Sequence, residues 1–120
     1  MKQYLLGMSL VVVGLTATAA GQASNQKISG YLVDSVCAVG HATEPGYVAN
    51  HDKRCQLMDA CIKSGYSLVT SDLKVLKLDQ KGDEQALALI KATDKDKGWK
   101  VVVTGKVEGQ TIAVSSIKLE

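Results

Sequence analysis

The chain has 120 residues, of which 46% are hydrophobic and 22% are charged, and its formal net charge is +2. This length accommodates one small domain, and the hydrophobic fraction excludes an intrinsically disordered chain. The chain contains one Trp, four Tyr and no Phe. Proteins that bind nucleic acids usually carry more positive charge or more stacking rings, so nucleic acid is not expected as a partner.

The first 23 residues are typical of a secretory signal peptide. Lys2 provides a positive charge, residues 5–17 form an apolar run, and small residues follow up to Ala23. The apolar run is shorter than the about 20 residues that a transmembrane helix needs, which makes an uncleaved membrane anchor the less favoured alternative. We therefore expect a cleaved signal peptide over residues 1–23, a periplasmic or secreted mature protein of residues 24–120, and no stable membrane anchor after cleavage.

The mature chain predicts five strands and two helices. Residues 74–78 alternate between polar and apolar, which is typical of a strand with one solvent-facing side. Asn50 and Asp83 are favourable N-caps, Gly65 is a favourable helix end, and Glu108 with Gly109 predicts a hairpin turn. The expected strands span residues 26–36, 66–70, 74–78, 99–107 and 111–119, the expected helices span about 51–64 and 83–91, and 37–49 is expected to be a loop.

The order of these elements indicates the fold. Strand, helix, strand, strand, helix, strand, strand is the order of the OB-fold, a five-stranded Greek-key barrel. We therefore predict a mainly β chain: an OB-like barrel with one helix between strands 1 and 2 and one between strands 3 and 4. The alternative is an α+β arrangement, with a sheet on one side and helices on the other. No repeat or Pro-rich linker divides residues 24–120, so they are predicted to form one domain, and a monomer is expected.

All Cys and His residues of the chain lie between positions 37 and 61. A continuous helix over residues 51–64 would place four side chains on one face: His51, Cys55, Met58 and Cys61. The preceding loop, which carries Cys37 and His41, leads directly to this helix. This convergence makes the segment the candidate functional site.

The first hypothesis for this segment is a bound metal ion. Thiolate and imidazole ligands suit zinc, whereas thiolate with thioether suits cuprous copper. The candidate ligands are Cys37, His41, His51, Cys55 and Cys61, of which the three thiolates and one imidazole would complete a set. Asp34 and Met58 are expected beside them. Asp34 would either cap the loop or accept a hydrogen bond from a His, and Met58 also fits the core.

The second hypothesis is a disulfide that joins Cys37 to Cys55 or to Cys61. It would attach the loop to the helix in a structural or protein-interaction module without a metal. Cys55 and Cys61 are not expected to pair with each other, because six residues of a straight helix separate their Cα atoms by about 9 Å. An odd number of cysteines in an oxidising compartment leaves one thiol unpaired.

The third hypothesis is a nucleophilic Cys with His41 or His51 as its base. Such a pair needs a group that orients the base, and the sequence offers only Asp52 or Asp59. We therefore expect no enzyme. The predicted function is an exported small binding protein with a Cys/His site for zinc or copper, or alternatively a module for an unknown protein partner.

Short motifs extend along nearly all of the mature chain. GYLVDSVC at residues 30–37 is followed by His41, and Cys55 and Cys61 precede KSGYSLV at residues 63–69. KVLKLD follows at residues 74–79, and a Lys-rich loop before Trp99 leads to VTGKVEGQTI at residues 103–112. In these motifs the chain resembles the DUF5818-like proteins, small exported bacterial OB-fold proteins of unknown function. The resemblance implies a barrel with a Cys/His-bearing helix at one end, and it implies no catalytic residue.

Overall fold

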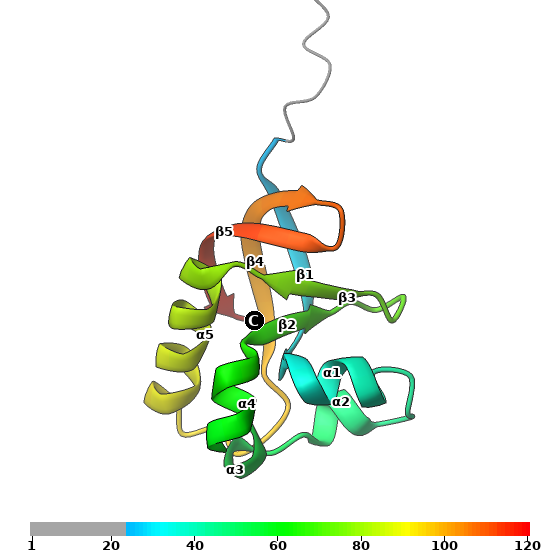
Figure 1. Cartoon of the computed structure of the whole chain (residues 1–120), viewed down its shortest axis with the longest axis vertical. Helices are drawn as coiled ribbons and strands as arrows, with labels where there is room; N and C mark the ends of the chain where they lie inside the picture. Colours follow the sequence, from blue (N-terminus) through cyan, green and yellow to red (C-terminus); the bar gives the residue numbers. More distant parts are fainter. Residues whose placement is uncertain (1–23) are drawn as a thin grey trace, which may run out of the picture.

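The computed structural model describes residues 24–120, and the expected signal peptide, residues 1–23, lies outside this range. The described strands are β1 (Gln26–Asp34), β2 (Tyr66–Val69), β3 (Val75–Leu78), β4 (Lys100–Glu108) and β5 (Thr111–Leu119). The described helices are α1 (Ser35–His41), α2 (Tyr47–Asn50), α3 (Lys53–Gln56), α4 (Asp59–Ser64) and α5 (Gln80–Ala92). Figure 1 shows the strands above a group of short helices, with α5 along one side. The chain is therefore mixed α/β rather than mainly β.

The five strands form one sheet that closes into a ring. Their order is β1-β2-β3-β5-β4, and the antiparallel pairing of β1 with β4 joins the two ends. β4 and β5 form the predicted hairpin, and a register shift between Thr104 and Gly105 interrupts their pairing. β3 and β5 meet in parallel through two residue pairs, Lys77 with Thr111 and Leu78 with Ile112. Because this contact is so short, the ring is not a true barrel.

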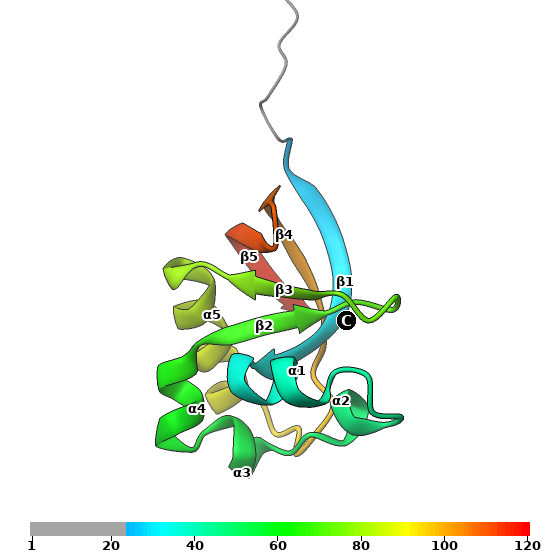
Figure 2. The ribbon, with the colours of Figure 1, turned by 45° about the vertical axis from the view of Figure 1, so that its right-hand side comes forward.

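Four short helices, α1 to α4, separate β1 from β2 and cover one end of the ring (Figure 1 and Figure 2). Asp34 begins α1 by accepting a hydrogen bond from the Cys37 N–H at 3.1 Å, and Asp52 begins α3 by accepting one from the Cys55 N–H at 2.8 Å. Met58 is extended between α3 and α4 (φ −66°, ψ 142°). The prediction of a loop over residues 37–49 and one helix over 51–64 was wrong, because these caps divide the segment into separate helical turns.

Gly65 ends α4 as predicted, with a positive φ of 74° that favours glycine. The second predicted helix begins earlier than expected. The N-cap of α5 is Asp79, not Asp83, and its carboxylate accepts hydrogen bonds from the N–H groups of Gly82 (2.9 Å) and Val114 (3.3 Å). The second bond attaches the start of α5 to β5. Among the described helices, including this 13-residue one, none combines the length and hydropathy that crossing a membrane requires.

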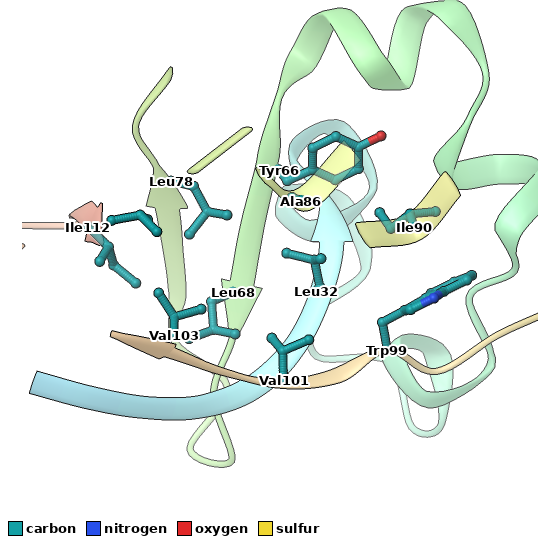
Figure 3. Packing of buried hydrophobic residues seen from close by; sticks show 11 residues of the cluster. Leu32, Tyr66, Leu68, Leu78, Ala86, Ile90, Trp99, Val101, Val103 and Ile112 are labelled. Atoms are coloured by element: carbon teal, nitrogen blue, oxygen red, sulfur yellow. The ribbon is translucent and has the colours of Figure 1, made fainter. Parts of the chain in front are cut away.

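The apolar core lies inside the ring and continues under α5 (Figure 3). Its buried side chains come from all five strands, from α5 and from the segment before β4: Leu32, Tyr66, Leu68, Leu78, Ala86, Ile90, Trp99, Val101, Val103, Ile112 and Val114. A smaller cluster under α1 contains Val33, Ala38, Ala42 and Val69. The main core holds the ring together, and the smaller cluster attaches α1 to the end of the sheet.

Candidate metal site

The carboxylate of Asp34 lies at the centre of the end of the ring that α1 to α4 cover, which we call the polar end. Asp34 is the last residue of β1 and is fully buried. Its Oδ1 lies 2.6 Å from Nε2 of His51, and its Oδ2 accepts the Cys37 N–H bond that begins α1. A carboxylate buried in this way is retained only because its oxygens are hydrogen-bonded. The sequence prediction that Asp34 would either cap the following segment or bond a His understated its role, because it does both.

Three potential metal ligands meet here from three parts of the chain. Asp34 ends β1, Cys37 lies in the first turn of α1, and His51 follows α2. One ligand atom from each residue, a carboxylate oxygen, the thiol sulfur and an imidazole nitrogen, lies within 4.8 Å of the other two. Asp34 and His51 are buried, and Cys37 is partly exposed. This group could therefore hold a metal ion.

Gln56 fixes the position of Asp34. Its amide is fully buried on α3, where Oε1 accepts the Asp34 N–H bond at 2.7 Å and Nε2 donates to the Leu32 carbonyl at 2.7 Å. The backbone carbonyl of Gln56 accepts a bond of 2.8 Å from the hydroxyl of Tyr66. One amide side chain thus extends the hydrogen bonding of β1 to a helix 22 residues away in the sequence.

Hydrogen bonds keep Asp34 ionised despite its burial. Burial alone raises the pKa of the Asp34 carboxyl, but bonds from His51, from the thiol and N–H of Cys37, and from the thiol of Cys61 together lower it below its ordinary value of 3.8. At neutral pH the site therefore presents a carboxylate, which is the form that binds a metal cation.

The thiols of the site are protonated in the metal-free protein. Burial raises the pKa of Cys37, a hydrogen bond from Tyr47 partly offsets this, and Asp34 raises it further, with a net upward shift. Burial and the bond to Asp34 raise the pKa of Cys61 to about 12. A metal that binds Cys37 must displace a proton from it.

The other predicted ligands, Cys61, Cys55 and His41, lie outside this three-ligand group. Cys61 is 7% exposed and donates hydrogen bonds through its thiol to Asp34 and Cys37. Cys55 lies on α3, where Asp52 accepts hydrogen bonds from its N–H and its thiol. His41 is 44% exposed and pairs with Glu44 at 2.7 Å.

The predicted common helix face does not exist, because His51, Cys55 and Cys61 lie on different elements. Met58 is 55% exposed, so its predicted core position was wrong: the chain bends at this residue and its side chain turns outward. Within residues 24–120, which include all three cysteines, every thiol is free.

Sequence reasoning missed Gln56 and Tyr47. Gln56 acts through its hydrogen bond to the Asp34 N–H, and no local sequence pattern predicts this contact. Tyr47 stacks on both histidines, with ring centroids 4.5 Å from His41 and 5.2 Å from His51. The sequence indicates the stacking of Tyr47 only through its position between the two histidines. That position brings the three rings together only because residues 47–50 form α2.

Comparisons with family models, curated proteins and solved structures find no match. Function is therefore inferred from the geometry of the site and from the sequence.

Proposed function

We propose that this chain is a small exported binding protein that holds one zinc ion between Asp34, Cys37 and His51. The observation that carries the proposal is the convergence of three ligand atoms of different chemistry within 4.8 Å of one another at a buried position. Zinc accepts oxygen, sulfur and nitrogen ligands in one tetrahedral set. Cuprous copper prefers thiolate and thioether sulfur, so this mixed set favours zinc over copper.

The spacing of the Asp34 and His51 ligand atoms fits zinc after a small adjustment. Zinc–oxygen and zinc–nitrogen bonds of about 2.0–2.1 Å place tetrahedral ligand atoms about 3.3 Å apart. The Oδ1 of Asp34 and the Nε2 of His51 are 2.6 Å apart, so they must separate by less than an ångström. The ion would take the place of the hydrogen between these two atoms, with the neutral imidazole of His51 carrying its proton on Nδ1, and Cys37 would release its thiol proton. Affinity should accordingly decrease as the pH falls.

Cys61 is the donor best placed to complete the set. Its thiol hydrogen-bonds to two of the three proposed ligands, Asp34 and Cys37. With Cys61 as fourth ligand the site would be closed, which suits metal storage or structural stabilisation. With water in that place the site would keep one open position. The raised pKa of Cys37 argues against a nucleophilic cysteine, because enzymes that use such a cysteine lower the pKa of its thiol.

The strand order supports an OB-like fold around this site. The ring β1-β2-β3-β5-β4, with α5 between β3 and β4, follows the five-stranded Greek-key arrangement. We also propose that the protein is exported, that it is a monomer, and that it resembles the DUF5818-like proteins. OB-folds often bind oligonucleotides, but a fold does not determine function, and the net charge of +2 gives little attraction for phosphates.

Zinc titration of the mature protein tests the proposal. We expect one zinc per chain by native mass spectrometry, lost on chelation, and a decrease in affinity of more than about 100-fold for Cys37→Ser or His51→Ala. Cys55→Ser is the matched control, because Cys55 bonds to Asp52 and lies outside the three-ligand group. The proposal fails if the wild type binds no metal, or if Cys55→Ser reduces affinity as much as Cys37→Ser does.

A disulfide-linked module is the second candidate function, and one observation favours a particular pair. The thiols of Cys61 and Cys37 lie close enough to affect each other's pKa, which favours this pair over Cys37 and Cys55 as the pair that oxidation would join. Thiol counting on the natively exported protein separates the two candidates. One titratable thiol, with a mass two hydrogens below that of the reduced chain, would indicate the disulfide. Three titratable thiols, of which Cys37 reacts only after chelation while Cys55 reacts before it, would indicate the metal.

A further inference from the structure

Three aromatic rings form a continuous stack from the protein surface to the candidate metal site. The rings of His41 and Tyr47 are 4.5 Å apart at an interplanar angle of 21°, and those of Tyr47 and His51 are 5.2 Å apart at 29°. His41 is 44% exposed, Tyr47 is half-buried and His51 is 5% exposed. The tyrosine ring therefore separates the buried imidazole from the solvent-exposed one.

The same tyrosine also reaches a second ligand of the site. Its hydroxyl lies beside the thiol of Cys37, and each group affects the pKa of the other. One side chain thus contacts two of the three proposed ligands, the imidazole with its ring and the sulfur with its hydroxyl.

The helix that carries Tyr47 is short and has no buried residue, and Val48 is the side chain that packs it on the smaller apolar cluster. α2 has four residues, and its N-cap, Gly46, has a φ of 75° and contributes no side-chain cap. Its end is held by a bond of 2.8 Å from the Asn50 side chain to the Gly46 carbonyl. A short helix without buried residues can open locally at low cost in free energy.

We propose that Tyr47 is the cover of the metal site: metal enters and leaves when α2 carries this ring away from His51 and Cys37. The proposal rests on the metal-binding function given above. With a metal bound, Cys37 is a thiolate, and the Tyr47 hydroxyl then donates a stronger, charge-assisted hydrogen bond. The closed position of Tyr47 is therefore favoured in the loaded protein, and the bound ion exchanges slowly.

Alkylation of the metal-free protein tests the cover without any metal. Cys37 and Cys55 are both partly exposed, so Cys55 serves as an internal reference in the same chain. We expect Tyr47→Ala to increase the rate of Cys37 alkylation by iodoacetamide about tenfold relative to Cys55, because two stacking contacts are lost. Tyr47→Phe keeps the ring and should stay near the wild-type rate. Tyr31→Ala, which removes a half-buried tyrosine outside the stack, is the matched control.

Zinc exchange supplies the second measurement. In stopped-flow experiments, Tyr47→Ala should increase both the association rate and the rate of release to excess chelator, whereas a merely structural loss would increase release alone. An unchanged Cys37 alkylation rate in a folded Tyr47→Ala protein overturns the cover, as does an equal acceleration by Tyr31→Ala. If the wild type binds no zinc but Tyr47→Ala exposes Cys37, the metal function fails and the covering role stands. Circular dichroism of each variant confirms that the fold is retained.

Discussion

The inside of the ring and the polar end under α1 to α4 are stabilised in different ways. The inside is a continuous apolar core to which every strand contributes, so each residue adds a share of the total burial. At the polar end a small apolar cluster lies under α1, and individual hydrogen bonds are prominent: Asp34 caps α1, Gln56 of α3 bonds to Asp34, and Asp52 caps α3. Stability is therefore spread over many side chains in the first region and concentrated in a few in the second.

The largest loss should follow a cavity in the apolar core. Ile112→Ala removes a fully buried side chain of β5 that belongs to the main core and not to the three-ligand group. We expect the free energy of unfolding to fall by about 2–5 kcal/mol, because both burial and packing are lost. Urea denaturation measures it, with Leu119→Ala as the control, since Leu119 is 43% exposed on the same strand. A loss below that of the control would show that the core is not continuous through β5.

The next largest effect should come from a single amide at the polar end. Gln56→Met keeps the approximate volume but leaves the Asp34 N–H and the Leu32 carbonyl without partners. We expect a loss of about 2–4 kcal/mol, since each buried unpaired group costs about 1–3 kcal/mol. Gln85→Met is the control, because Gln85 makes one exposed bond of 3.3 Å. Equal losses in the two variants would contradict a special role of Gln56.

The same contrast explains what could be predicted from the sequence. The five strands and α5 were predicted with small errors at their ends, because alternation, turn glycines and apolar stripes are local patterns. The segment between β1 and β2 was predicted wrongly, because Asp52 and the extended Met58 divide a run of residues that otherwise suits one helix. Cys37 and His51, which residue type made candidate ligands, are two of the three members of the group that could hold a metal.

Asp34 was placed beside the candidate ligands rather than among them. That it joins the three-ligand group depends on a buried contact across 17 residues of sequence. Such a contact is set by how the helices close over the ring, which no local pattern encodes.

A smaller effect concerns two carboxyls whose contributions to stability depend on pH with opposite signs: Asp34, which is buried, and Asp83, which is partly buried. The pKa of Asp34 is lowered in the folded chain by the hydrogen bonds that outweigh its burial, so its stabilising contribution is present above about pH 4 and is lost as the pH falls through the folded pKa. Burial raises the pKa of Asp83, despite its bond of 2.8 Å from the Tyr66 N–H. Its contribution is present below the ordinary pKa and is lost as the pH rises through the folded one.

Urea denaturation between pH 2.5 and about 6 measures both carboxyls. The stability difference between wild type and Asp34→Asn should increase with pH, and that between wild type and Asp83→Asn should decrease. Parallel curves for the two variants would contradict the opposite environments of these groups.

The smallest effect should be a gain in the free energy of unfolding from a substitution at the polar end. Gly40 lies inside α1, and a Cβ built on it meets no atom within 4 Å. Gly40→Ala should therefore stabilise the protein by about 0.5–1 kcal/mol, since alanine loses less backbone freedom on helix formation. Gly30→Ala is the matched comparison in β1: its Cβ would lie 2.5 Å from the Val69 carbonyl oxygen, so this variant should be destabilised. If α1 holds Asp34 and Cys37 in place as described, Gly40→Ala should also leave zinc affinity unchanged or slightly higher. A loss of affinity in this more stable variant would mean that α1 must loosen for the metal to bind.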